Sequence, residues 1–336
     1  MAPLLLQLIL TLLIILAAAE LFTNALEHLG ARLKISEGVT GSLFAAVGTA
    51  LPETLVPLLA LFAGTENRNT NEEIGVGAIL GAPLMLSTLS TCLMAVAIFG
   101  RRGFTGWVQP ERTGLQRDLH FFLFAFVLAT AAMYVPQQLH IVRVALSATL
   151  VLTYFVYILL TLRASEHLVS GGHGTEADEK MLLNRIGLPE NIFTIMLQLA
   201  IGLGLLVLGA EGFINGIEGV SQLLGISALL LSLLVIPIAT ELPEKINSIL
   251  WIRRGKDTLA FGNITGAMVF QGTLLPAIGI MLTPWQPRIE VLSGVLVTLV
   301  AAAWLRINWR ARGIPVWVLL GNGVLYVIYL AITLSR

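Results

Sequence analysis

Long runs of apolar residues, separated by short stretches that carry Arg, Pro, Asn and Gly, extend over the whole chain. A helix needs about 20 mostly apolar residues to cross the ~30 Å hydrocarbon core of a bilayer. Ten stretches have about this length, at 3–29, 38–63, 73–99, 118–135, 141–162, 191–221, 226–252, 258–283, 289–306 and 314–334. The pattern predicts an all-α membrane protein with ten transmembrane helices.

The composition also indicates that this chain lies in a lipid membrane. Of its 336 residues, 56% are hydrophobic and 12% are charged, and the formal net charge is zero. Soluble proteins carry about 25% charged residues. These values exclude a disordered chain, a nucleic-acid-binding protein and an ordinary soluble enzyme. A single cysteine, Cys92, excludes an intramolecular disulfide and a cysteine metal cluster.

The basic residues are unevenly divided between the two sets of connecting loops. The loops after the first, third, fifth, seventh and ninth stretches hold fifteen of the 20 Lys and Arg residues. Loops rich in Lys and Arg face the cytoplasm. We therefore expect a multi-pass protein of the cell inner (plasma) membrane with both termini outside the cytoplasm. The longest loop, 163–190, is then cytoplasmic.

An internal repeat relates the two halves of the chain on either side of this loop. A shift of 191 residues superimposes short motifs of the first half on the second, and a shift of 185 continues the match. The pairs include Ala19-Glu20 with Ala210-Glu211, Leu51-Pro52-Glu53 with Leu242-Pro243-Glu244, Gly77 with Gly262 and Gly81 with Gly266.

The repeat divides the chain into a first five-helix repeat (1–162), a cytoplasmic linker loop (163–190) and a second five-helix repeat (191–336). Because five is odd, the second repeat must enter the membrane in the opposite sense to the first. Inverted-topology repeats recur in secondary transporters, whose substrate sites lie near the bilayer midplane where the repeats meet.

Both repeats place a carboxylate in the middle of an apolar stretch. Glu53 and Glu244 end the paired Leu-Pro-Glu segments, and Glu241 lies three residues before Glu244. An ionisable group inside the bilayer costs a few kcal/mol, so its default interpretation is functional. The three glutamates are therefore the first candidates for a site.

The prolines of these segments supply further oxygen ligands. Pro52 and Pro243 have no N–H to donate, so each frees a carbonyl four residues earlier. Thr49 and Thr240 stand four residues before Glu53 and Glu244, on the same helix face. Carboxylate, carbonyl and hydroxyl oxygens together are the ligands of hard cations, above all Ca²⁺.

The stretches that follow, 73–99 and 258–283, are rich in glycine, which we interpret as close helix packing. Asn263, Thr265 and Gln271 differ because each brings a polar oxygen into the span. Gln271 is the best second-tier ligand of the three. Asp118, at the start of the fourth stretch, is interpreted as an interfacial residue.

These segments together resemble the cation/Ca²⁺ exchanger superfamily, and most closely its prokaryotic Na⁺/Ca²⁺ exchangers. That family carries Gly-Thr-Ser-Leu-Pro-Glu followed by Gly-Asn-x-x-Gly-Ser-Asn in each repeat. The matching segments are Gly48–Glu53 with Gly77–Pro83, and Ala239–Glu244 with Gly262–Met268. The resemblance implies that Glu53 and Glu244 are the central Ca²⁺ ligands, completed by the backbones of Thr49 and Thr240. It also implies that the first and sixth helices slide to alternate access.

The chain departs from the family pattern at several ligand positions. The serine after each threonine is replaced by Ala50 and by Glu241, and a later polar or acidic position by Leu86 and Gln271. Most hydroxyl groups that resemble Na⁺ ligands are therefore missing. Crowded carboxylates favour a bound proton, so coupling to H⁺ gains weight. Lys245 either pairs with a carboxylate or extends to the cytoplasmic side.

The sequence thus predicts a secondary active antiporter that moves a divalent cation, foremost Ca²⁺, in exchange for Na⁺ or H⁺. The alternatives are an H⁺-coupled or monovalent cation exchanger with altered selectivity, a passive channel, and an intramembrane enzyme with Glu53 and Glu244 as an acid–base pair. We expect no enzyme activity and no cofactor. The expected partners are membrane lipid and inorganic cations, and no nucleic acid. The expected oligomeric state is a monomer.

Overall fold

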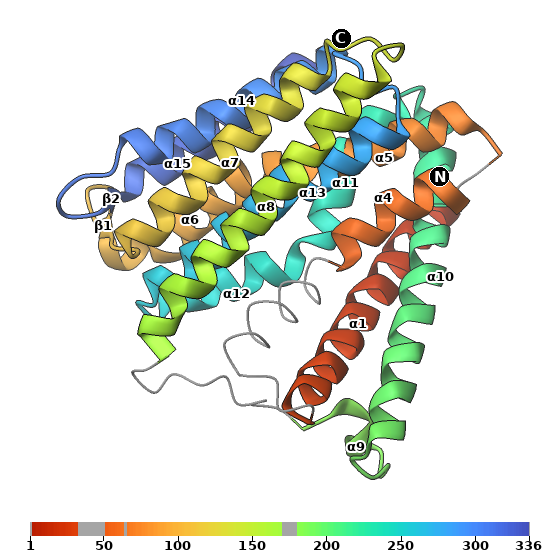
Figure 1. Cartoon of the computed structure of the whole chain (residues 1–336), viewed down its shortest axis with the longest axis horizontal. Coiled ribbons are helices and arrows are strands. Elements are labelled where there is room, and N and C mark those ends of the chain that lie inside the picture. Colours follow the sequence, from red (N-terminus) through yellow and green to blue (C-terminus); the bar gives the residue numbers. More distant parts are fainter. Residues whose placement is uncertain (1, 33–50, 64–65, 170–179, 336) are drawn as a thin grey trace. The chain divides into compact units, whose positions relative to one another are not determined.

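The structure is a computed structural model that describes residues 2–32, 51–63, 66–169 and 180–335. The described part of the chain is helical (Figure 1), apart from one pair of two-residue strands. The elements are α1 (Ala2–Arg32), α4 (Leu51–Ala63), α5 (Arg68–Met85), the π-helical turn η2 (Leu86–Ser90), α6 (Thr91–Arg102), β1 (Trp107–Val108), α7 (Arg112–Ala132), α8 (His140–Val169), α9 (Leu182–Arg185), α10 (Ile192–Leu224), α11 (Ala228–Thr240), α12 (Leu242–Arg253), α13 (Asp257–Leu282), α14 (Ile289–Ile307), β2 (Ile314–Pro315) and α15 (Val316–Leu334).

The chain divides into two compact units, each considered by itself below. Unit 1 comprises Met1–Asn71 and Ile158–Gly225, and unit 2 comprises Glu72–Tyr157 and Ile226–Arg336. Each unit takes segments from both predicted repeats, so the units are not the repeats. The division of the chain at 163–190 stays a prediction.

Eight helices among the described residues are long and apolar enough to cross a membrane. They occupy eight of the ten predicted stretches. The second stretch, 38–63, is described only from Leu51 onward, where it forms α4. The seventh, 226–252, is not one helix but two, α11 and α12, which meet at Glu241. The count of ten spans and their inverted arrangement stay predictions.

In unit 1, α1 and α10 lie side by side and antiparallel along their length (Figure 1). Gln7 Nε2 donates to the Gly212 carbonyl, and Gln198 Nε2 donates to the Leu21 carbonyl, both at 2.9 Å. Gln198 lies 191 residues after Gln7, and Leu21 lies 191 residues before Gly212, so the internal repeat relates the two contacts. A Cβ on Gly202 would lie 3.0 Å from the backbone nitrogen of Phe22, so the helices approach closely there.

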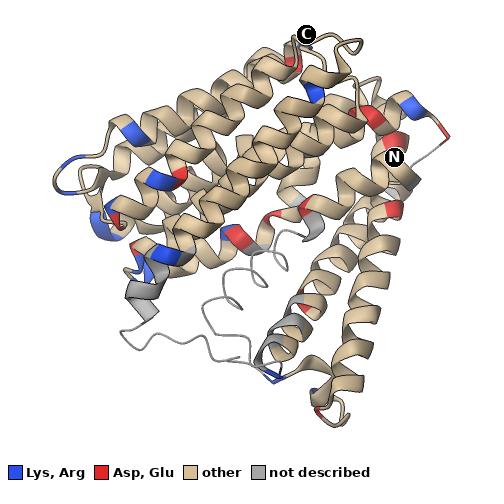
Figure 2. Ribbon diagram, viewed as in Figure 1, with Lys and Arg blue, Asp and Glu red and all other residues tan. Residues whose placement is uncertain are grey.

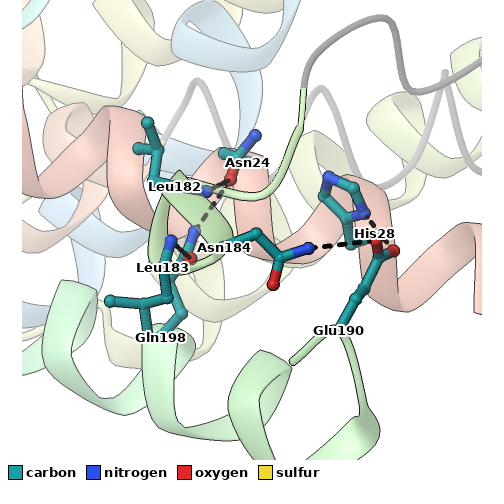
Figure 3. A network of polar contacts seen from close by, with 7 residues as sticks. All are labelled: Asn24, His28, Leu182, Leu183, Asn184, Glu190 and Gln198. Carbon is teal, nitrogen blue, oxygen red and sulfur yellow. Dashed lines mark hydrogen bonds and ion pairs between the residues drawn. The ribbon is translucent and has the colours of Figure 1, made fainter. Parts of the chain in front are cut away.

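The chain around α9 is packed on one end of this helix pair (Figure 3). The N–H of Leu182 donates to Asn24 Oδ1 at 2.9 Å, and the N–H of Leu183 donates to Gln198 Oε1 at 3.0 Å. His28 Nδ1 and Glu190 Oε1 are 2.9 Å apart. Buried Met181 packs with an apolar cluster of the two helices. The last part of the predicted loop is therefore packed against α1 and α10.

In unit 2, basic residues gather where α6, α12 and α14 end and α7, α13 and α15 begin (Figure 2). The Arg102 guanidinium donates two hydrogen bonds, of 2.7 and 2.8 Å, to the Asp257 carboxylate, and the N–H of Gln109 donates to the same carboxylate. The strands β1 and β2 pair antiparallel at this end. The contacts hold the N-terminus of α13, which carries candidate ligands, in a fixed position.

Candidate cation-binding site

The second Leu-Pro-Glu segment lies at a break between two helices of unit 2. Glu241 separates α11 from α12, with φ −97° and ψ 11°. Pro237 lies inside α11 and Pro243 in the first turn of α12, so two N–H groups are missing around the break. The N–H of Glu241 reaches the Pro237 carbonyl only at 3.3 Å. Transporters build ion sites at such interrupted helices, because a break exposes backbone oxygens to a cavity.

The break holds three charged side chains that are almost completely buried. Glu241 is 0% exposed, and Glu244 and Lys245 are each 5% exposed. The Lys245 ammonium attracts the Glu241 carboxylate, and the Glu244 carboxylate repels it. The net charge of these three groups, when ionised, is negative, which favours a cation.

Gln271, on α13, makes the direct contact with Glu241. Its Nε2 donates to Glu241 Oε1 at 2.7 Å. Among the described residues, Glu241 Oε2 and Gln271 Oε1 are buried without a hydrogen-bond partner. An unsatisfied buried polar atom costs about 1–3 kcal/mol, and more when it is charged. Two such oxygens, on side chains that contact each other, fit a cation or a proton as the missing partner.

Two other predicted ligands have hydrogen bonds that stabilise the helices. Thr240 is buried, and its hydroxyl donates to the Ile236 carbonyl at 3.2 Å, within α11. Asn263 Nδ2 donates to the Glu244 carbonyl at 3.0 Å and to Ser248 Oγ at 2.9 Å. Asn263 thus ties α13 to α12 beside Glu244. Their roles as ligands stay predictions.

Lys245 points back across the break. Its Nζ donates to the carbonyl of Pro237, eight residues earlier, at 2.8 Å. The alternative that this side chain extends to the cytoplasmic side is therefore wrong. A lysine can direct three N–H donors at the oxygens around it, and this one is held among the oxygens of the break.

The first Leu-Pro-Glu segment belongs to unit 1. Glu53 lies in the first turn of α4 and is 4% exposed. Thr49 lies outside the described residues. The predicted meeting of Glu53 and Glu244 stays a prediction, because the two residues belong to different units.

Sequence reasoning misjudged one buried carboxylate of unit 2. Helix α7 begins at Arg112, so Asp118 lies in its second turn, 4% exposed, and not at an interfacial helix start. Its carboxylate accepts hydrogen bonds from Thr265 Oγ1 at 2.7 Å and from the Tyr157 hydroxyl at 3.1 Å. The available signal was Thr265, a hydroxyl inside the second glycine-rich segment.

Gly77 and Gly81, in α5, are packing positions, as predicted, whereas a Cβ on Gly262, in α13, would meet nothing within 4 Å. A Cβ on Gly77 would lie 2.7 Å from the Cβ of Ser232, and one on Gly81 would lie 2.4 Å from the Leu233 carbonyl oxygen. The missing side chains allow α5 to lie directly against α11, the helix that ends at the break. Close packing of this kind fixes the position of the Pro237 region.

Comparisons with known proteins agree with the fold and the motifs. The family model described as sodium/calcium exchanger protein matches residues 3–163 and 194–335. The chain therefore belongs to the sodium/calcium exchanger family, whose members are membrane transporters, and the resemblance inferred from the paired Leu-Pro-Glu segments is confirmed.

Relatives match over most of the chain. Inner membrane protein YrbG of Escherichia coli (strain K12) is 25% identical over 329 residues, which cover 96% of this chain and 94% of YrbG. The putative antiporter CaxA of Alkalimonas amylolytica is 25% identical over 273 residues, 80% of this chain and 77% of CaxA.

Solved structures show the same fold. A crystal structure of the H⁺/Ca²⁺ exchanger CAX superimposes with a TM-score of 0.70 at 18% identity, covering 99% of this chain and 87% of CAX. The sodium-calcium exchanger NCX_Mj superimposes with a TM-score of 0.59 at 19% identity, covering 98% and 99%. The fold is thus shared by an H⁺-coupled and a Na⁺-coupled exchanger.

Proposed function

We propose that the protein is a secondary active antiporter that carries a divalent cation, foremost Ca²⁺, across the membrane in exchange for H⁺ or Na⁺. The observation that carries this proposal is the buried helix break with Glu241 and Glu244. It offers two carboxylates, together with an amide oxygen from Gln271 that has no other partner among the described residues. Hard divalent cations select such oxygen ligands.

In this proposal Glu244 and Glu53 are the principal ligands of the transported ion. Glu241 adds a further carboxylate charge, Gln271 supplies an amide oxygen, and the backbones at Thr49 and Thr240 supply carbonyl oxygens. Asn263 positions α12 through its bond to the Glu244 carbonyl. The ion is the substrate of the protein and no cofactor takes part.

We favour H⁺ over Na⁺ as the counter-ion. A Na⁺ site needs several neutral oxygens, whereas Glu241 is buried, contacts an amide on one oxygen and leaves the other without a described partner. A proton on that oxygen would neutralise the carboxylate at little geometric cost. The two exchangers with the same fold differ in their counter-ion, so the fold itself favours neither.

We further propose ten spans in two inverted repeats, with both termini outside the cytoplasm and one chain as the functional unit. The matched Gln7 and Gln198 contacts support the repeat, because one shift of 191 residues relates them in an antiparallel helix pair. The basic end of unit 2 supports the orientation. The α1–α10 pair is the element that slides to alternate access.

Flux measurements in proteoliposomes test the function. Vesicles loaded at acidic pH, or loaded with Na⁺, receive Ca²⁺ or Mn²⁺ outside, and uptake is compared with that in vesicles without either gradient. We expect uptake to follow the outward H⁺ gradient more strongly than the Na⁺ gradient. Uptake that needs no counter-ion would indicate a channel, and the absence of uptake for every ion pair would contradict the proposal.

A further inference from the structure

Lys245 is a buried cation inside a site for cations, and the proposed exchange gives it no role. It is 5% exposed and follows directly after Glu244. Its Nζ donates to the Pro237 carbonyl at 2.8 Å, so the side chain reaches back over the break. A buried ammonium loses its hydration, and this loss is offset only by nearby oxygens and negative charges.

The surroundings of Lys245 resemble those of a bound monovalent ion. The groups around Lys245 include the Pro237 carbonyl, which accepts from Nζ, and the Glu241 carboxylate, which attracts the ammonium. Carbonyl and carboxylate oxygens are also the ligands that a metal cation takes from proteins. Lysine differs from such an ion because its four-carbon stem attaches the charge permanently to α12.

We propose that Lys245 is a tethered cation that takes the place of a transported monovalent ion. This inference rests on the proposed function. The ammonium offsets one carboxylate charge of the site through the whole cycle, so one fewer free cation is needed when the divalent ion leaves. Exchange then requires no Na⁺, although the chain belongs to the sodium/calcium exchanger family. The attached charge also repels the divalent ion and weakens its binding.

A purely structural role for Lys245, as a staple between α12 and the Pro237 carbonyl, predicts the opposite sign for its removal. Without a staple the break loosens and Ca²⁺ binds more weakly. Without a tethered cation, one carboxylate charge is freed and Ca²⁺ binds more tightly. The sign of the change in Ca²⁺ affinity therefore separates the two roles.

The test compares Lys245→Met with the wild type by calorimetric titration of Ca²⁺ into the purified full-length protein in Na⁺-free detergent buffer. We expect Lys245→Met to tighten Ca²⁺ binding about tenfold or more, because a unit charge acts strongly at short range in a buried site. We also expect added Na⁺ to weaken Ca²⁺ binding in this variant but not in the wild type. Unchanged or weaker Ca²⁺ binding by Lys245→Met would overturn the inference.

Two control variants and one wild-type measurement complete the test. Lys245→Arg keeps the charge, and we expect it to keep the wild-type insensitivity to Na⁺. Lys256→Met makes the same change at an exposed lysine, and its binding should equal that of the wild type. Should Lys245→Met fail to fold, a Na⁺ requirement of wild-type Ca²⁺ flux overturns the inference and Na⁺-independent flux supports it. A wild type that carries neither Ca²⁺ nor Mn²⁺ would refute the proposed function itself.

Discussion

The α1–α10 pair and the α11–α12 break both contain buried polar side chains, and the hydrogen bonding of these side chains differs between the two regions. In the α1–α10 pair they include the neutral amides Asn24 and Gln198, and Gln198 uses both ends of its side chain, donating to the Leu21 carbonyl and accepting from the N–H of Leu183. At the α11–α12 break they are charged, and Glu241 Oε2 has no partner among the described residues. One region is satisfied by the protein alone, and the other is not.

The difference shows that burial of a polar residue does not by itself indicate a site. A satisfied amide network stabilises two helices against each other and gives a membrane protein a fixed contact. A buried carboxylate with a spare oxygen keeps an unfavourable energy that a cation or proton removes. The distinction can be tested, because variants of the break should change transport, and variants of the helix pair should change stability.

The largest effect is expected at the two principal carboxylates. Glu244→Gln and Glu53→Gln should each reduce Ca²⁺ flux in proteoliposomes on the order of 100-fold or more, because a neutral amide cannot replace a charged ligand of a hard cation. Both variants should reach the membrane in normal amounts, since an amide is less costly to bury than a carboxylate. Near-normal flux of either variant would show that the assigned site is wrong.

A matched pair of glycine substitutions tests the packing beside the break. Gly81→Ala places a methyl group 2.4 Å from the Leu233 carbonyl oxygen. Because this oxygen belongs to the backbone, it cannot move aside without displacing α11. We expect a loss of about 1–3 kcal/mol in the free energy of unfolding, seen as a lower melting temperature in detergent. Gly100→Ala, in α6, should instead gain about 0.5–1 kcal/mol. A stable Gly81→Ala protein with normal flux would contradict the close approach of α5 to α11.

The sequence predicted the features that depend on local pattern. Apolar length predicted the helices, and the repeat of Leu-Pro-Glu predicted where charge enters the membrane. It did not predict that α11 ends one residue before Glu241, since two prolines allowed several breaks. Nor did it predict the docking of Leu182 on Asn24, a contact between residues 158 positions apart. Such long-range contacts depend on how elements pack and have no local signature.

The two glutamines of the helix pair should differ in effect, although the repeat relates them. Gln198→Leu removes contacts with the Leu21 carbonyl, Asn24 Oδ1 and the N–H of Leu183, whereas Gln7→Leu removes one, with the Gly212 carbonyl. At about 1 kcal/mol for each hydrogen bond, we expect the free energy of unfolding to fall by roughly 2–3 kcal/mol in Gln198→Leu and by roughly 1 kcal/mol in Gln7→Leu. Denaturant unfolding in detergent measures both. Equal losses would contradict the additional contact with the linker, and neither variant should change the counter-ion.

A small effect, on stability alone, is expected at the N-cap of α7, outside both regions. The Glu111 carboxylate accepts from the N–H groups of Thr113, at 2.7 Å, and Gly114. Slight burial raises the pKa of Glu111, but the two N–H groups outweigh it, so its pKa lies below the ordinary value. The cap therefore stabilises the folded protein at neutral pH, and the contribution is lost as the pH falls through that lowered pKa.

Glu111→Ala should accordingly cost about 1 kcal/mol at pH 7 and leave Ca²⁺ flux and the choice of counter-ion unchanged. The melting temperatures of the variant and the wild type should converge as the pH is lowered past the pKa of Glu111, because protonation removes the charge that the N–H groups stabilise. A difference that persists in strong acid would show that the side chain acts through packing. A change in counter-ion would instead mean that groups outside the break control coupling, contrary to the roles assigned to Glu241 and Lys245.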